Sequence, residues 1–179
     1  MMARMEKKAA PRPSAEEFHP VRVIGSIFRV RRDLTLLIKK HVLPGAGLTL
    51  EEADLLMDLF GAAKLGWSDP AADEHGYVTF AALKASLVHS PSALSRRVAA
   101  LQKVGLLEAR KVHKISRDAK ADRRSLALRI TPAGIKRIEP VYERYAELCG
   151  RLLRDVPTNV RRTIIEINET LMEKARWGV

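Results

Sequence analysis

The feature that most limits the fold of this chain is a pair of β-rich runs that directly follow a helical segment. The runs are residues 106–112 and 125–131, and the second alternates leucine and isoleucine with other residues, as strands do. The segment before them, residues 91–104, has helical periodicity and stops at a glycine. A helix–turn–helix followed by a two-stranded hairpin is the winged-helix arrangement, so the pattern predicts that a second helix precedes this one.

The rest of the chain is patterned for helices, and one of them supplies that second helix. Residues 80–87 are predicted to form a short helix after a capping threonine, with a very short strand at Tyr77-Val78. Thr49 and Glu52 have the spacing of a capping box at the start of another helix. Apolar residues recur at helical spacing over 20–43, 49–65, 132–152 and 157–172. The sequence therefore predicts a mainly α (α+β) protein, a winged helix-turn-helix with flanking helices.

The flanking helices carry apolar faces that so small a winged-helix lobe does not need. A second copy of the same chain is the commonest way to cover such faces, so we expect a homodimer. The predicted organisation is a helical dimerisation region made of residues 18–48 and 132–179, and a winged helix-turn-helix DNA-binding lobe at 49–131. Residues 1–17, rich in Ala, Pro, Lys and Ser, are predicted to form a disordered N-terminal tail.

The positive charge of the chain is concentrated in its hairpin region. Residues 90–137 hold thirteen Lys and Arg against three Asp and Glu, a net charge of +10 out of +11 for all 179 residues. A solvated surface normally mixes the two signs. One-sided charge of this density suits phosphate binding, because each neutralised phosphate also releases counterions. The charge indicates an anionic partner such as nucleic acid or an acidic membrane surface, and double-stranded DNA is the partner that we predict.

The helix at 91–104 has one face suited to reading DNA. At about 100 degrees per residue, Leu94, Val98 and Leu101 form a buried stripe, which leaves small, hydroxylic and basic side chains on the other side. Small residues let a helix enter the major groove, serine can bond any base edge, and arginine can chelate guanine. The candidate DNA-binding residues of this region are Ser90, Ser92, Ser95, Arg96, Arg97 and Lys103.

The loop between the two β-rich runs, residues 113–124, is predicted to form a basic hairpin tip. An arginine at such a tip can enter a narrow minor groove, where the negative potential is deepest. Asp122, two residues before Arg124, is expected to pair with that arginine and to orient it. The candidate DNA-binding residues of the tip are Lys114, Arg117, Arg123 and Arg124.

Three stretches of this region resemble the MarR family of bacterial winged-helix transcription regulators. They are HSPSALSRRVAALQKVGLL at 89–107, DRRS at 122–125 and LRITPAG at 128–134. The resemblance implies a dimer whose first and last helices form the interface. It also implies binding to a pseudo-palindromic operator, as a repressor that a small, often aromatic, ligand releases.

The resemblance also assigns residues, and it leaves two segments open. The Asp-x-Arg motif of the family's wing matches Asp122 and Arg124. The wing of this chain is longer than is usual in the family, so Arg117 or Arg123 can take the place of Arg124 in the minor groove. The family has no role for the acidic residues of the long loop at 66–76. The family's effector pocket lies where the dimerisation helices meet the DNA-binding lobe, and Arg31, His41 and Tyr142 are its candidate polar groups.

Two functional classes stay open, and several others lack support. A sequence-independent nucleoid, architectural or RNA-binding protein would share the basic hairpin but would not need a base-reading helix. No constellation for an enzyme is recognised, and we expect no metal and no cofactor, because five scattered histidines and one cysteine fit no ligand pattern. Cys149 is expected to be a small buried interface residue and not a redox thiol. No apolar run is long enough for a membrane span, so a cytoplasmic protein is expected.

Overall fold

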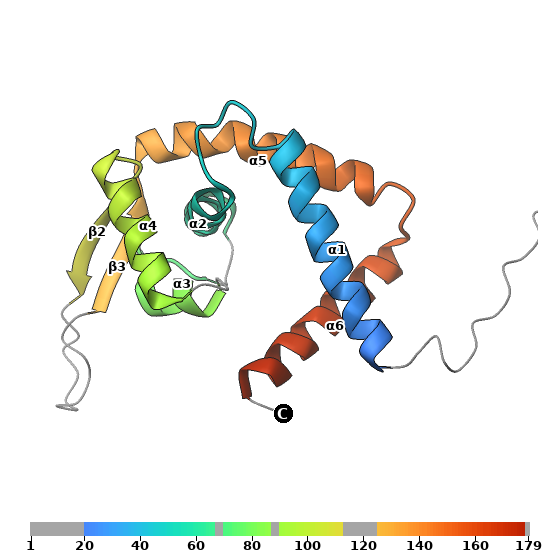
Figure 1. Cartoon of the computed structure of the whole chain (residues 1–179). Coiled ribbons are helices and arrows are strands. Elements are labelled where there is room, and N and C mark those ends of the chain that lie inside the picture. Colours follow the sequence, from blue (N-terminus) through green and yellow to red (C-terminus); the bar gives the residue numbers. More distant parts are fainter. Residues whose placement is uncertain (1–19, 67–69, 87–89, 113–124, 178–179) are drawn as a thin grey trace, which may run out of the picture.

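The structure is a computed structural model that describes residues 20–66, 70–86, 90–112 and 125–177 (Figure 1). Helices and three short strands follow one another in the predicted order, which confirms the mainly helical winged-helix class. The elements are α1 (Pro20–His41), α2 (Leu50–Phe60), the π-helical turn η2 (Gly61–Leu65), β1 (Val78–Thr79), α3 (Phe80–Ser86), α4 (Pro91–Lys103), β2 (Leu107–Val112), β3 (Ser125–Ile130), α5 (Pro132–Leu152) and α6 (Thr158–Trp177).

The three strands form one antiparallel sheet in the order β1-β3-β2. Glu108 of β2 lies opposite Arg129 of β3, and Val78 of β1 lies opposite Leu128 on the other side of β3. The short strand is one residue later than the sequence predicted, because Val78 and Thr79 make the pairs with β3. The two long strands therefore form the hairpin, and β1 anchors it to the helical part of the lobe.

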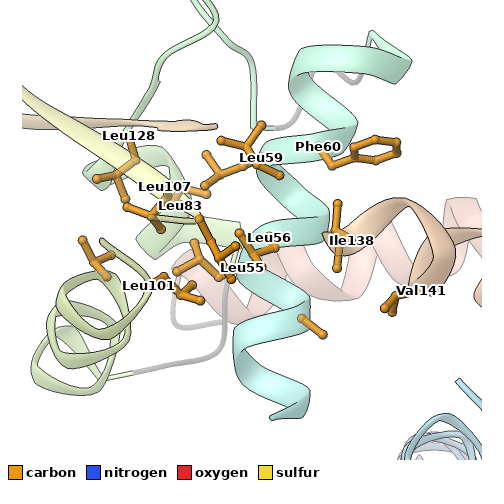
Figure 2. Close-up of a cluster of buried hydrophobic side chains, with 14 of the residues drawn as sticks. Leu55, Leu56, Leu59, Phe60, Leu83, Leu101, Leu107, Leu128, Ile138 and Val141 are labelled. Carbon is orange, nitrogen blue, oxygen red and sulfur yellow. The ribbon is translucent and has the colours of Figure 1, made fainter. Parts of the chain in front are cut away.

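The core of the lobe is a cluster of buried leucines and their neighbours (Figure 2). Leu55, Leu56 and Leu59 of α2 are 0–1% exposed and occupy its centre. The predicted stripe of α4 is confirmed, since Leu94, Val98 and Leu101 are all buried. The other elements contribute Leu83 of α3, Leu107 of β2, Leu128 of β3 and Ile138 and Val141 of α5. One core thus holds α4 and the hairpin against α2 and α5.

Local capping interactions set where two of these helices begin. Thr49 and Glu52 form the predicted capping box, in which the Glu52 amide donates to the Thr49 hydroxyl at 3.2 Å and the Thr49 amide donates to the Glu52 carboxylate at 2.8 Å. Thr131 caps α5, and its hydroxyl accepts from the Gly134 amide at 3.0 Å. These bonds satisfy amides that have no partner inside their own helix.

Gly134 is also where α5 comes closest to the hairpin. A Cβ on Gly134 would lie 2.1 Å from the Leu106 carbonyl oxygen and 2.7 Å from the side chain of Ile130. Only glycine permits this approach, which seats the first turn of α5 on the start of β2. The long helix then runs away from the hairpin, toward α1 and α6 (Figure 1).

Candidate nucleic-acid interface

Helix α4 begins at a capping serine, Ser90, which is itself exposed. The Ser90 hydroxyl accepts from the Ala93 amide at 3.3 Å, and Pro91 follows at the first helical position, where it forfeits no hydrogen bond. The Ser90 and Ser92 hydroxyl oxygens are 3.2 Å apart. Ser90 therefore holds the N-terminus of α4, in addition to being a predicted DNA contact.

The exposed face of α4 carries the residues that the helical spacing predicted. Ser92, Ser95, Arg96 and Lys103 are all exposed, on the side away from the buried stripe. Ala99, between them, is exposed as well and adds no bulk. The structure thus brings together hydroxyl groups, one guanidinium and one ammonium on a slim helical surface, which is the shape that a major groove accepts.

Arg97 does not share this face. Its side chain is half-buried, and its Nη1 atom is buried without a hydrogen-bond partner in the described part of the chain. Its positive charge acts instead on Asp54 of α2, whose pKa it helps to lower against the stronger effect of burial. Arg97 lies about 100 degrees around the helix from Arg96, and its DNA contact stays a prediction from the sequence.

The predicted tip of the wing lies outside the described residues. This applies to Lys114, Arg117, Arg123 and Arg124 and to the orienting Asp122. Strands β2 and β3 lead to the tip from the lobe (Figure 1). The roles of these residues stay predictions from the sequence.

The base of the wing is held by a turn that the sequence analysis left without a role. The Asp73 carboxylate accepts from the His75 and Tyr77 amides, both at 2.9 Å, and forms an ion pair with Arg110 of β2. The same backbone hydrogen bonds, that from Tyr77 above all, hold the pKa of Asp73 below its ordinary value. The sequence did contain a signal for this turn. Asp at the first position and glycine at the fourth, here Asp73 and Gly76, are common in β-turns.

Tyr77 and Arg129 complete this contact between turn and wing. The Tyr77 ring lies under two guanidinium groups, with the Arg110 carbon 3.9 Å and the Arg129 carbon 4.7 Å from its centre. Arg129 also forms an ion pair with Glu108 and donates to the His75 carbonyl at 3.2 Å. Two of the hairpin's cations, Arg110 and Arg129, are therefore engaged in contacts within the protein.

A cavity of about 290 Å³ lies between α1, α2 and α5. Ile38, Val42, Met57 and Val141 make most of its wall apolar, while Asp54, Asp58 and Tyr145 add polar groups. Burial, with smaller effects from Cys149 and Asp54, raises the pKa of Tyr145 to about 12. Burial also raises the pKa of Asp54, assisted by Glu51.

The polar groups expected in this cavity are not the ones that line it. Arg31, His41 and Tyr142 were candidates, and none of the three is part of its wall. The Tyr142 ring packs against Phe60 instead, with 5.5 Å between ring centres. Tyr145 lies one turn after Val141, so these two side chains share the side of α5 that lines the cavity.

Neither a family model nor a curated protein matches the sequence. Solved structures do match. A MarR-family transcriptional regulator from Silicibacter pomeroyi is 17% identical, with a TM-score of 0.66 over 90% of this chain and 94% of that one. A mutant MarR from E. coli complexed with operator DNA is 18% identical, with a TM-score of 0.60 over 87% and 96%.

A third match is an organohalide-sensing transcriptional regulator in its 2,4-dichlorophenol-bound form, which is 16% identical and has a TM-score of 0.57 over 90% of this chain and 83% of that one. In the described residues, no helix is long and apolar enough to cross a membrane. The order of the helices, the small antiparallel sheet and these matches agree. The chain has the winged-helix fold of the MarR-family transcriptional regulators.

Proposed function

We propose that the protein is a homodimeric, sequence-specific DNA-binding transcription regulator. The observation that carries the proposal is the exposed face of α4, where Ser92, Ser95 and Arg96 stand opposite a fully buried stripe. In this proposal α4 reads base edges in the major groove, and an arginine of the wing enters the adjacent minor groove. The likeness in fold to a regulator solved with operator DNA supports it.

The dimer is proposed from the exposed apolar side chains of the terminal helices. Helix α1 has no buried residue, and α6 shows apolar side chains that are about half exposed, such as Ile164 at 46% and Ile165 at 56%. Both helices lie at the end of α5 away from the hairpin (Figure 1). A second copy would cover these faces and place two α4 helices on one duplex, which calls for a pseudo-palindromic operator.

The proposed regulation is repression that a small ligand releases. The cavity between α1, α2 and α5 touches both parts of the molecule, because α1 and α5 belong to the proposed dimerisation region and α2 to the lobe. A ligand that fits only one spacing of the two lobes would shift the dimer away from the spacing that DNA needs. A regulator of this fold solved with 2,4-dichlorophenol supports a ligand-responsive function.

The test is a salt titration of DNA binding for two variants, on the operator and on random duplex. Arg96→Ala is expected to weaken operator binding by about 1–3 kcal/mol and to relax the preference at one position in each half-site. Arg124→Ala is expected to weaken binding to both duplexes and to reduce the salt slope by about one unit per site. Arg151→Ala is the control, because Arg151 is exposed on the last turn of α5 and pairs only with Glu147.

The ratio of the wild-type protein's affinities for operator and random DNA distinguishes between the two functional classes. Specific regulators bind their site at least about 10³-fold tighter than random DNA. A ratio below about tenfold would support the sequence-independent nucleoid or RNA-binding alternative instead. If Arg96→Ala weakened binding to both duplexes equally, the assignment of α4 as the base-reading helix would be wrong.

A further inference from the structure

One face of α5 forms a basic cleft on the lobe, separate from the cavity described above. Ala133, Lys136, Arg137, Pro140 and Arg144 recur at the spacing of a single helical face. The cleft has a volume of about 480 Å³. Its other walls are the turn between α1 and α2, at Gly45 and Ala46, and the junction of α4 and β2, at Val104 and Leu106.

Two of the three cations of this cleft are held by backbone carbonyl groups and not by a carboxylate. Arg137 donates from Nη1 to the Ala46 carbonyl at 3.1 Å, and Arg144 donates from Nε to the Val42 carbonyl at 2.8 Å. Each bond uses one N–H group of a guanidinium that carries five. In the parts of the chain that the structure describes, no ion pair involves Lys136, Arg137 or Arg144. Among the described residues, the positive charge of the cleft therefore has no carboxylate partner.

The start of α5 adds to this potential. Ala133 lies in the first turn of a 21-residue helix and lines the cleft. Amides of a first turn carry the positive end of the helix dipole, which favours an anion beside them. The C-terminal end of α4, at Val104, also borders the cleft and opposes this potential, so the attraction for an anion comes chiefly from the side-chain cations.

We propose that this cleft binds a small organic anion, with its carboxylate or phosphate group at Lys136 and Arg144 and a compact aliphatic body against Val104, Leu106 and Pro140. The wall residues are aliphatic, so a saturated body suits them. The cavity between α1, α2 and α5 is the wrong site for such a ligand, because Asp54 and Asp58 line it and no lysine or arginine does.

The cleft lies at the junction between α4 and β2. Val104 and Leu106, which follow α4 and precede β2, form part of its wall. A ligand there would contact this junction directly.

The test uses the full-length protein without DNA, so that it does not depend on the proposed function. Calorimetry would compare cyclohexanecarboxylate, the neutral cyclohexanecarboxamide and inorganic phosphate. We expect the carboxylate to bind one per chain, at least about tenfold tighter than the amide, and to shift the amide signals of Ala46 and Ala133 in nuclear magnetic resonance spectra. If inorganic phosphate displaces the bound carboxylate, the site is assigned to phosphate esters. If phosphate does not displace it, the site is assigned to carboxylates with an apolar body.

Two variants and a control locate the site. Lys136→Gln is expected to weaken carboxylate binding about tenfold, the loss of one charged contact of about 1.4 kcal/mol. Val104→Ser is expected to weaken the carboxylate and to leave phosphate binding unchanged. Lys64→Gln, an exposed lysine on η2 that does not line the cleft, is expected to have no effect. Equal binding of acid and amide, no binding of either anion, or unchanged binding in Lys136→Gln would overturn the proposal.

Discussion

Asp73 and Arg110 form an ion pair that ties the turn before β1 to strand β2, across 37 positions of the sequence. The same carboxylate closes its own turn by accepting two backbone N–H groups. One side chain therefore fixes the shape of the turn and attaches it to the base of the wing. The contact uses a cation of the basic region for the fold, which reduces the number available to DNA.

Asp73→Ala is expected to destabilise the protein by about 1 kcal/mol, since two amides lose an acceptor at a partly exposed site. The pKa of Asp73 is lowered in the folded state, chiefly by the Tyr77 amide, so its contribution is present above the ordinary value of 3.8 and is lost as the pH falls below that value. Urea unfolding of both proteins at pH 7 and at pH 3 measures this. The difference between them should shrink at pH 3.

Glu74→Ala is the matched control for Asp73→Ala. Glu74 is the next residue, and its exposed contact with His75 at 3.5 Å is a surface pair of little value. A change below about 0.5 kcal/mol is expected for it at both pH values. Equal losses for the two variants would show that the turn does not depend on the Asp73 carboxylate.

Gly134→Ala is expected to destabilise the protein by about 1–3 kcal/mol, because the new methyl group would overlap the Leu106 carbonyl oxygen and α5 would have to move away from β2. Gly150→Ala lies in the same helix, where a Cβ meets nothing within 4 Å. It is expected to stabilise the protein by about 0.5–1 kcal/mol through helix propensity. Chemical unfolding gives both values, and a destabilisation of the same size in both variants would refute the close-approach argument.

Ile164→Asp is expected to convert the dimer to monomer and to weaken operator binding severely. The substitution places a charge in an apolar face of α6 that is exposed in the single chain. Sedimentation velocity measures the oligomeric state. Thr170→Asp adds the same charge at an exposed polar position about 120 degrees around the helix from Ile164 and should remain dimeric. An intact Ile164→Asp dimer would count against α6 as part of the interface.

Cys149→Ser is expected to leave DNA binding unchanged under reducing and under mildly oxidising conditions. The thiol is half-buried and lies one turn after Tyr145, and a serine hydroxyl is close to it in size. A redox sensor needs an exposed thiol with a lowered pKa. Release of DNA by peroxide in the wild type, absent from the variant, would contradict this prediction.

Several features of the site followed from the sequence because their causes are local. The stripe of Leu94, Val98 and Leu101 depends only on helical periodicity, and the exposed positions of Ser92 and Arg96 follow from it. The hairpin was predictable because β-rich runs that flank a loop pair with each other. The sequence did not indicate that the neighbouring Arg97, about 100 degrees around the helix from Arg96, would have its Nη1 atom buried.

Other features exist only where distant segments meet. The sequence by itself determined the elements, their caps and the exposed face of α4, since these depend on residues within a turn or two of each other. The tertiary structure alone decided that Asp73 holds Arg110, that Gly134 admits a carbonyl of the α4–β2 junction, and that Arg144 reaches Val42 across 102 positions. Such contacts depend on how the core packs α5 against α2 and the sheet, and no local spacing in the sequence encodes that packing.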